Sequence, residues 1–106
     1  MRGGRRRVDA NQAAIVAALR AAGCSVWCTY ACGHGAPDLV VGYRNKTVLM
    51  EIKSDEGDRL TPDEQRWHTQ WRGGPLVVVR SPAFALWVMG LGQDQRELGI
   101  HEIGED

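Results

Sequence analysis

Residues 37–53 read PDLVVGYRNKTVLMEIK, and this stretch decides the expected fold. Apolar runs lie on both sides of Arg44-Asn45, two residue types that suit a two-residue β-hairpin turn. The β-branched residues in both runs favour strands. We therefore expect one strand over 39–41, a second over 47–52, and a tight turn between them.

The register of this hairpin brings two carboxylates together. With a two-residue loop, Tyr43 pairs with Lys46. Counting back along both strands then places Asp38 opposite Glu51. Directly opposed residues have Cβ atoms about 5 Å apart, and like charges at that distance repel unless a cation lies between them. The pair therefore predicts a site for a hard divalent cation with oxygen ligands, Mg²⁺ or Mn²⁺.

A lysine completes the predicted catalytic group. Strand alternation puts Glu51 and Lys53 on one face of the hairpin, while Met50 and Ile52 point to the other face, into the core. An ammonium group beside a metal ion can hold a water molecule and neutralise the charge that develops when phosphorus is attacked. The pattern therefore indicates phosphodiester hydrolysis. The alternative is that the same residues form a solvated hairpin surface without a function.

Helices and further strands are expected on both sides of the hairpin. Asp9 and Gln12 resemble a capping box, and Thr61 with Pro62 starts a second helix. The order α, β, β, β, α, β, α predicts an α/β fold with a mixed sheet flanked by helices. The expected elements are a helix from Asp9 to Gly23, a strand over 25–30, a helix over about 62–72, a strand over 76–79 and a short helix after Ser81-Pro82.

Composition sets the class of protein. The chain has 106 residues, of which 43% are hydrophobic, enough for one compact core. We expect residues 1–8 to form a basic flexible arm and residues 9–106 to form one domain. No apolar run approaches the roughly 20 residues that cross a bilayer, so no membrane contact is expected. Three cysteines, an odd number, and no export signal favour a reducing, cytoplasmic location.

The charges are unevenly distributed although the net charge is zero. Four arginines, Arg2, Arg5, Arg6 and Arg7, lie at the N-terminal end. An arm of this kind can bind DNA phosphates, and a solvated terminus without a partner is the alternative.

The spacing of Pro37-Asp38 and Glu51-Ile52-Lys53 resembles that of the PD-(D/E)xK nuclease superfamily, whose members share a restriction-endonuclease-like core. The resemblance continues along the chain. The run LTPDEQ at residues 60–65, Gly74, and the run VVVRS at residues 77–81 are similar, in order and spacing, to the VRR-Nuc family. The similarity covers roughly residues 9–88.

The resemblance implies a role for each matching position. Asp38, Glu51 and the backbone carbonyl of Ile52 would bind the metal, Lys53 would be the catalytic lysine, and Gln65 would be an active-site residue on the second helix. The implied activity is cleavage of DNA that leaves a 5′ phosphate. The family also places an acidic residue on the first helix, where this sequence has Asp9 at the cap and then Asn11 and Gln12, so a second metal site stays open.

The substrate and assembly follow from the same resemblance. Members that stand alone resemble Holliday-junction resolving enzymes, in which the two active sites of a C2 homodimer cut opposed strands. A four-way junction is therefore the expected substrate, and a bacterium or bacteriophage is the expected source. Flaps, nicks, single strands, unspecialised duplex and RNA remain alternatives, as does a non-catalytic nucleic-acid-binding module on the same fold.

Two other groups of residues have competing interpretations. Cys24, Cys28, Cys32 and His34 could form a zinc-stabilised module, but in a strand the first two would be about 13 Å apart, too far to share one ion. His34 precedes the Pro-Asp signature and is a candidate for contacting DNA. Trp67 and Trp71 lie on the second helix, and we expect at least one of them in the core.

Overall fold

The computed structural model describes residues 3–55 and 57–92, with side chains from Val8 onward. The order of elements agrees with the α, β, β, β, α, β, α order predicted from the sequence, with one additional 3₁₀ turn. The elements are α1 (Gly3–Ala21), β1 (Ser25–Cys28), η1 (Tyr30–Cys32), β2 (Leu39–Tyr43), β3 (Lys46–Ile52), α2 (Pro62–Gln70), β4 (Leu76–Val79) and α3 (Pro82–Val88).

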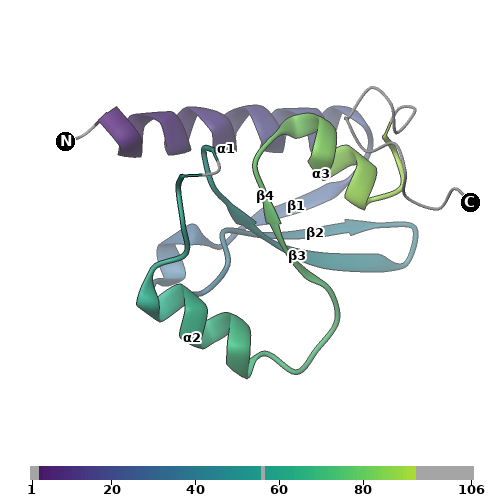
Figure 1. Ribbon diagram of the computed structural model, residues 1–106. Coiled ribbons are helices and arrows are strands. Elements are labelled where there is room, and N and C mark those ends of the chain that lie inside the picture. Colours follow the sequence, from purple (N-terminus) through teal and green to yellow (C-terminus); the bar gives the residue numbers. More distant parts are fainter. Residues whose placement is uncertain (1–2, 56, 93–106) are drawn as a thin grey trace, which may run out of the picture.

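The strands form one mixed sheet in the order β1-β2-β3-β4 (Figure 1). The pairs β1–β2 and β2–β3 are antiparallel, and β4 runs parallel to β3 after the connection through α2. In the central hairpin Tyr43 pairs with Lys46, as predicted. Arg44 and Asn45 both have positive φ angles, 49° and 66°, which is the conformation of a type I′ turn. The turn therefore fixes the register on which the site depends.

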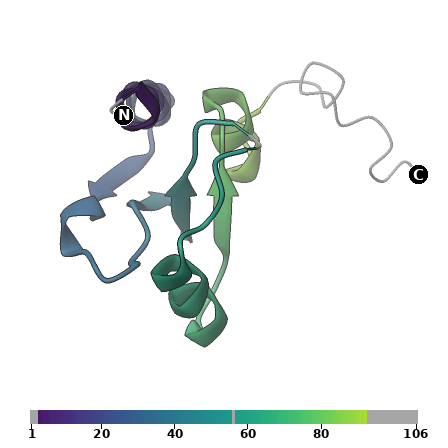
Figure 2. The same ribbon diagram turned by 60° about the vertical axis from the view of Figure 1, so that its left-hand side comes forward.

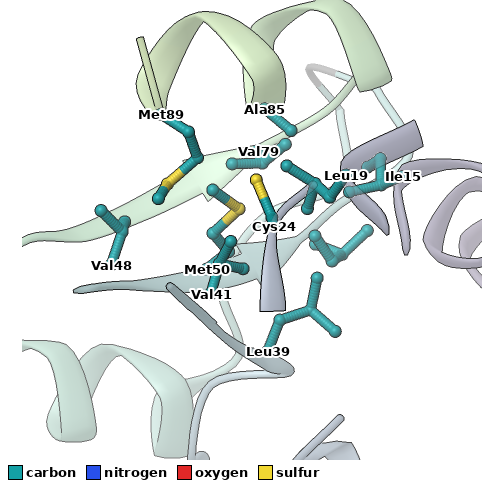
Figure 3. Packing of buried hydrophobic residues seen from close by; sticks show 11 residues of the cluster. Ile15, Leu19, Cys24, Leu39, Val41, Val48, Met50, Val79, Ala85 and Met89 are labelled. Carbon is teal, nitrogen blue, oxygen red and sulfur yellow. The ribbon is translucent and has the colours of Figure 1, made fainter. Parts of the chain in front are cut away.

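The helices lie on opposite faces of this sheet. Figures 1 and 2 show α1 and α3 on one face and α2 on the other. The hydrophobic core fills the space under α1 and α3, where alternate strand residues meet the apolar faces of both helices (Figure 3). Its buried members are Ile15, Leu19, Cys24, Leu39, Val41, Val48, Met50, Ile52, Val79, Ala85 and Met89. No described helix is both long and apolar enough to cross a membrane.

Both predicted helix starts on either side of β4 are confirmed. Thr61 caps α2, and its side chain accepts a hydrogen bond from the Glu64 amide, while the Glu64 side chain accepts from the Thr61 amide. Ser81 caps α3 in the same way, through the Phe84 amide. A side-chain cap replaces a partner that the first turn of a helix lacks. These caps fix where α2 and α3 begin.

Three predictions about elements are wrong. Helix α1 begins at Gly3 and not at Asp9, because the arginines before Asp9 favour a helix and no proline stands between Gly3 and Asp9. The first strand ends at Cys28, and Tyr30 belongs to the 3₁₀ turn η1. Trp67 of α2 and Trp71, which follows this helix, do not join the core, because α2 lies on the opposite face of the sheet. Trp67 is half-buried and stacks on Trp71, with ring centroids 5.2 Å apart.

Candidate active site

The pairing of the hairpin continues one residue beyond β2, to Asp38. The Asp38 amide donates to the Met50 carbonyl at 3.0 Å, and Asp38 Oδ2 accepts from the Ile52 amide at 2.8 Å. Glu51 lies between those two residues of β3. The structure therefore brings the carboxyl groups of Asp38 and Glu51 together, as the hairpin register predicted, and Glu51 is only 2% exposed.

The position of Asp38 is fixed by Thr29, which follows β1. The Thr29 amide donates to the Asp38 carbonyl at 2.7 Å, and Thr29 Oγ1 donates to the Pro37 carbonyl at 2.8 Å. Both bonds act on backbone groups, so the Asp38 side chain remains free to face Glu51. Thr29 was predicted to lie in a strand, and neither of these two bonds was predicted.

Lys53 follows β3 directly and lies on the same side as Glu51, as alternation predicted. Its ammonium nitrogen is 4.0 Å from Glu51 Oε2, and the residue is 7% exposed. Asn11 of α1 donates its side-chain amide to the Lys53 carbonyl at 2.8 Å and to the Arg80 carbonyl at 3.1 Å. One polar residue of α1 thus holds the ends of β3 and β4 beside the site.

Glu64 is the residue of this site that sequence reasoning missed. Its Oε1 accepts a hydrogen bond from Lys53 Nζ at 2.8 Å and another from the Thr61 amide, also at 2.8 Å. The motif around Thr61 and Pro62 predicted a helix start and no contact between Glu64 and Lys53. A buried lysine needs an opposite charge, and that requirement was the available signal.

His68 lies one turn after Glu64 on the same helix. Its Nε2 is 3.9 Å from Glu51 Oε1, beyond hydrogen-bonding distance. Both atoms are buried, and within the described part of the chain neither has a hydrogen-bond partner. Burial lowers the pKa of His68, so its imidazole is neutral at neutral pH.

The two central carboxyl groups are strongly perturbed. Burial, followed by the adjacent Asp38 carboxylate, raises the pKa of Glu51 to about 10. Burial also raises the pKa of Asp38, although the Ile52 amide that donates to it counteracts the rise. Without a cation the pair therefore retains a proton at neutral pH.

The Lys53–Glu64 pair behaves in the opposite way. Burial alone would lower the pKa of Lys53, but the hydrogen bond and charge of Glu64 outweigh it, and the net pKa is raised. Burial would raise the pKa of Glu64, and the hydrogen bond from Lys53 instead lowers it. Both groups are charged at neutral pH. Lys53 is therefore an ammonium ion that can stabilise negative charge and cannot take a proton.

The donor set fits a hard divalent cation. Asp38 and Glu51 supply carboxylate oxygens, and a buried Glu51 oxygen has no hydrogen-bond partner among the described residues. No three His, Cys, Asp or Glu side chains in that part of the chain form a ready-made cage. A cation held by Asp38 and Glu51 would complete its coordination with backbone, water or phosphate oxygens, which is usual for Mg²⁺. The three cysteines are free thiols, with Cys24 buried and Cys32 exposed.

Other predicted site residues lie outside this cluster. Gln65 is exposed, and its side chain donates to the Leu60 carbonyl at 3.3 Å, in a separate hollow of about 550 Å³. His34 is exposed in the loop before Pro37 and has a φ of 58°. The Ile52 amide contacts Asp38, and metal binding by the Ile52 carbonyl stays a prediction. The side chains of Arg5, Arg6 and Arg7 lie outside the described part, so their contact with DNA also stays a prediction.

A hollow of about 640 Å³ leads to Asp38 from the side of α1. Helix α1 contributes Asp9 and Gln12 to its lining, and η1 contributes Tyr30. The volume is in the range of small-molecule pockets. Asp9 and Gln12 of α1 thus line the same space as Asp38.

Comparison with known proteins agrees with this geometry. No protein-family model matches the sequence, and no curated protein matches it. A solved structure described as a VRR_NUC domain does match, with a TM-score of 0.65 and 27% sequence identity. The match covers 79% of this chain and 95% of that chain. This match supports membership of the VRR-Nuc family. The match confirms the predicted α/β fold, which is compatible with a restriction-endonuclease-like core, and it supports a nuclease fold family for this chain.

Proposed function

We propose that the protein is a divalent-cation-dependent endonuclease that hydrolyses phosphodiester bonds in DNA. The observation that carries this proposal is the pairing of the half-buried Asp38 with the buried Glu51 beside the charged ammonium group of Lys53. Bringing two carboxylates together in a buried position is unfavourable without a cation. Membership of a nuclease fold family supports DNA as the substrate.

Each residue of the cluster has a chemical role in this proposal. Asp38 and Glu51 bind Mg²⁺ or Mn²⁺, which supplies Lewis acidity toward phosphate and activates bound water. Lys53 stabilises the negative charge that develops on phosphate oxygens during an in-line displacement. Glu64 holds Lys53 in its charged form through the 2.8 Å hydrogen bond.

We propose a four-way DNA junction as the preferred substrate and a C2 homodimer as the active form. The support is the resemblance to stand-alone family members that are similar to junction-resolving enzymes. In a C2 dimer two identical active sites are related by a twofold axis, which suits paired cuts in opposed strands. One small domain would then supply the chemistry, and the partner would supply the geometry.

The test is cleavage of a labelled four-way junction beside matched duplex, flap and single strand, with Mg²⁺, with Mn²⁺ and with EDTA. We expect paired, metal-dependent cuts in the junction. The Lys53→Ala variant should lose activity by on the order of 10²-fold or more. Lys46→Ala is the matched control, because Lys46 is the other lysine of the chain and lies exposed at the far end of β3.

Each alternative function has its own outcome. Metal-dependent cutting of another DNA structure, or of RNA, would keep the catalytic mechanism and reject the junction preference. If folded protein cut no DNA or RNA with either metal, a non-catalytic binding module would be the better description. A strict monomer that nevertheless resolved junctions would reject the homodimer.

A further inference from the structure

We infer that His68 is an additional metal ligand in the active site, which gives the protein a preference for Mn²⁺ over Mg²⁺. This inference rests on the proposed function, because it requires a cation at Glu51. It goes further by assigning a nitrogen ligand from α2, a residue outside the predicted metal-binding set.

Two buried atoms without hydrogen-bond partners lie at a distance that one cation can bridge. Glu51 Oε1 and His68 Nε2 are 3.9 Å apart, buried, and without hydrogen-bond partners in the described part of the chain. Two donors that bind one cation at about 2.1 Å are roughly 3.0 Å apart at a right angle and roughly 4.2 Å apart when opposite. A separation of 3.9 Å is too long for a hydrogen bond but within reach of a shared cation.

The two carboxylate oxygens of Glu51 face different neighbours. Glu51 Oε2 faces Lys53, whose ammonium nitrogen is 4.0 Å away, whereas Oε1 faces α2. A buried carboxylate oxygen without a partner costs free energy, and so does a buried imidazole nitrogen without one. One cation between the two would satisfy both atoms.

The position of His68 is set by contacts at the start of α2. Glu64 and His68 are four residues apart, so they share one face of α2. The Lys53–Glu64 ion pair and the Thr61 cap fix the start of this helix against the site. The imidazole is therefore held over Glu51 by contacts that do not depend on His68 itself. Such pre-positioning is what a ligand needs to bind without reorganisation.

The chemistry of an imidazole ligand determines the preferred metal. Mg²⁺ prefers oxygen ligands, and divalent transition metals accept imidazole nitrogen more readily. A site with carboxylates alone would show a smaller difference between the two ions. We expect His68→Gln to weaken Mn²⁺ binding by on the order of tenfold or more, and to change Mg²⁺ binding by less than about twofold.

The experiment is pulsed electron paramagnetic resonance of Mn²⁺ bound to the protein, with natural or ¹⁵N-labelled histidine. We expect ¹⁴N modulation in the unlabelled wild type and its replacement by ¹⁵N modulation in the labelled protein. The modulation should disappear in His68→Gln, which separates His68 from the chain's other histidines, His34 and His101. Competition between Mg²⁺ and Mn²⁺ for binding to the wild type and to His68→Gln measures how far the substitution reduces the preference for Mn²⁺.

The outcomes separate this inference from the proposed function. Mn²⁺ that binds wild type and not Glu51→Gln, yet shows no histidine nitrogen coupling, would overturn the role of His68 and keep the metal site. Mn²⁺ that binds neither protein, or both equally, would overturn both proposals. If His68→Gln does not fold, the ¹⁵N-labelled wild-type protein still shows whether a histidine nitrogen binds Mn²⁺.

Discussion

At the residue scale, the buried position of Glu51 beside Asp38 favours cation binding and lowers the stability of the metal-free protein. Folding raises the pKa of Glu51 from 4.5 to about 10. Between pH 4.5 and about pH 10, Glu51 therefore carries a proton in the folded chain that it lacks in the unfolded chain. The stability of the metal-free protein should therefore fall as pH rises through this window. Glutamine has a similar shape and no proton to lose. We expect Glu51→Gln to stabilise the metal-free protein at pH 8 by about 1 kcal/mol or more.

The measurement for Glu51 is urea unfolding of both proteins from pH 5 to 9 in EDTA. The advantage of Glu51→Gln should increase with pH and should reverse when Mn²⁺ is added, because only the wild type gains stability from binding. A stability difference between the two proteins that stayed constant with pH would contradict a raised pKa of Glu51.

Glu64 allows a second prediction at the residue scale. Glu64→Gln keeps a hydrogen-bonding side chain near Lys53 but removes the charge that holds its ammonium group. We expect cleavage to fall about tenfold, as for other residues that position a metal-site group. The pH dependence of cleavage should also change, because the pKa of Lys53 would no longer be raised by Glu64.

Asp63→Asn is the control for Glu64→Gln. Asp63 lies on the same turn of α2 and loses the same charge, but its side chain is exposed and pairs with Arg66. Equal losses of activity in the two variants would show that only the charge of the helix start matters and would reject a specific role for Glu64.

At the scale of elements, the site requires the loop before β2 to lie directly against α2. Gly35 has a φ of 84°, and a Cβ atom there would collide with the Asp63 backbone. Gly33 also has a positive φ, 74°, but a Cβ atom there would meet nothing within 4 Å. We expect both alanine variants to be strained, and Gly35→Ala to be less stable than Gly33→Ala by about 1–3 kcal/mol in urea unfolding. Equal stabilities would argue against close packing of the loop on α2.

The difference between hairpin and helix explains which parts of the site could be predicted. Asp38, Glu51 and Lys53 belong to one hairpin, so the turn at Arg44-Asn45 and strand alternation fix their relation locally. Glu64 depends on how a nine-residue helix docks across the chain, which no local pattern specifies. The periodicity of α2 is that of a helix, but it does not indicate which face of the sheet the helix covers. The expected burial of Trp67 or Trp71 failed for that reason.

At the scale of the whole molecule, the site lies where structures from both sides of the sheet converge. Asn11 reaches the end of β3 from the side of the core helices, and Glu64 reaches Lys53 from the opposite side. The sheet supplies the carboxylates between them. The sequence predicted the order of the elements and a mixed sheet flanked by helices, since short apolar runs and caps are local signals. The contacts between layers depend on tertiary packing, so the sequence left them open.

The N-terminal arginines provide a prediction that involves the whole molecule, because binding of DNA depends on total phosphate contacts. Each neutralised phosphate contributes about 0.9 to the slope of log affinity against log salt on duplex DNA. Removal of residues 1–7 eliminates four arginines, Arg2, Arg5, Arg6 and Arg7, and leaves the core residues of α1 in place. If all four bind phosphates, the slope should fall by about 3–4 and the affinity should decrease most at low salt.

Fluorescence anisotropy with labelled DNA between 50 and 200 mM salt measures both quantities, and circular dichroism checks that the truncated chain is folded. A folded, truncated protein with unchanged affinity and unchanged slope would reject the phosphate-binding interpretation and leave DNA binding to the surface around Asp38 and Lys53.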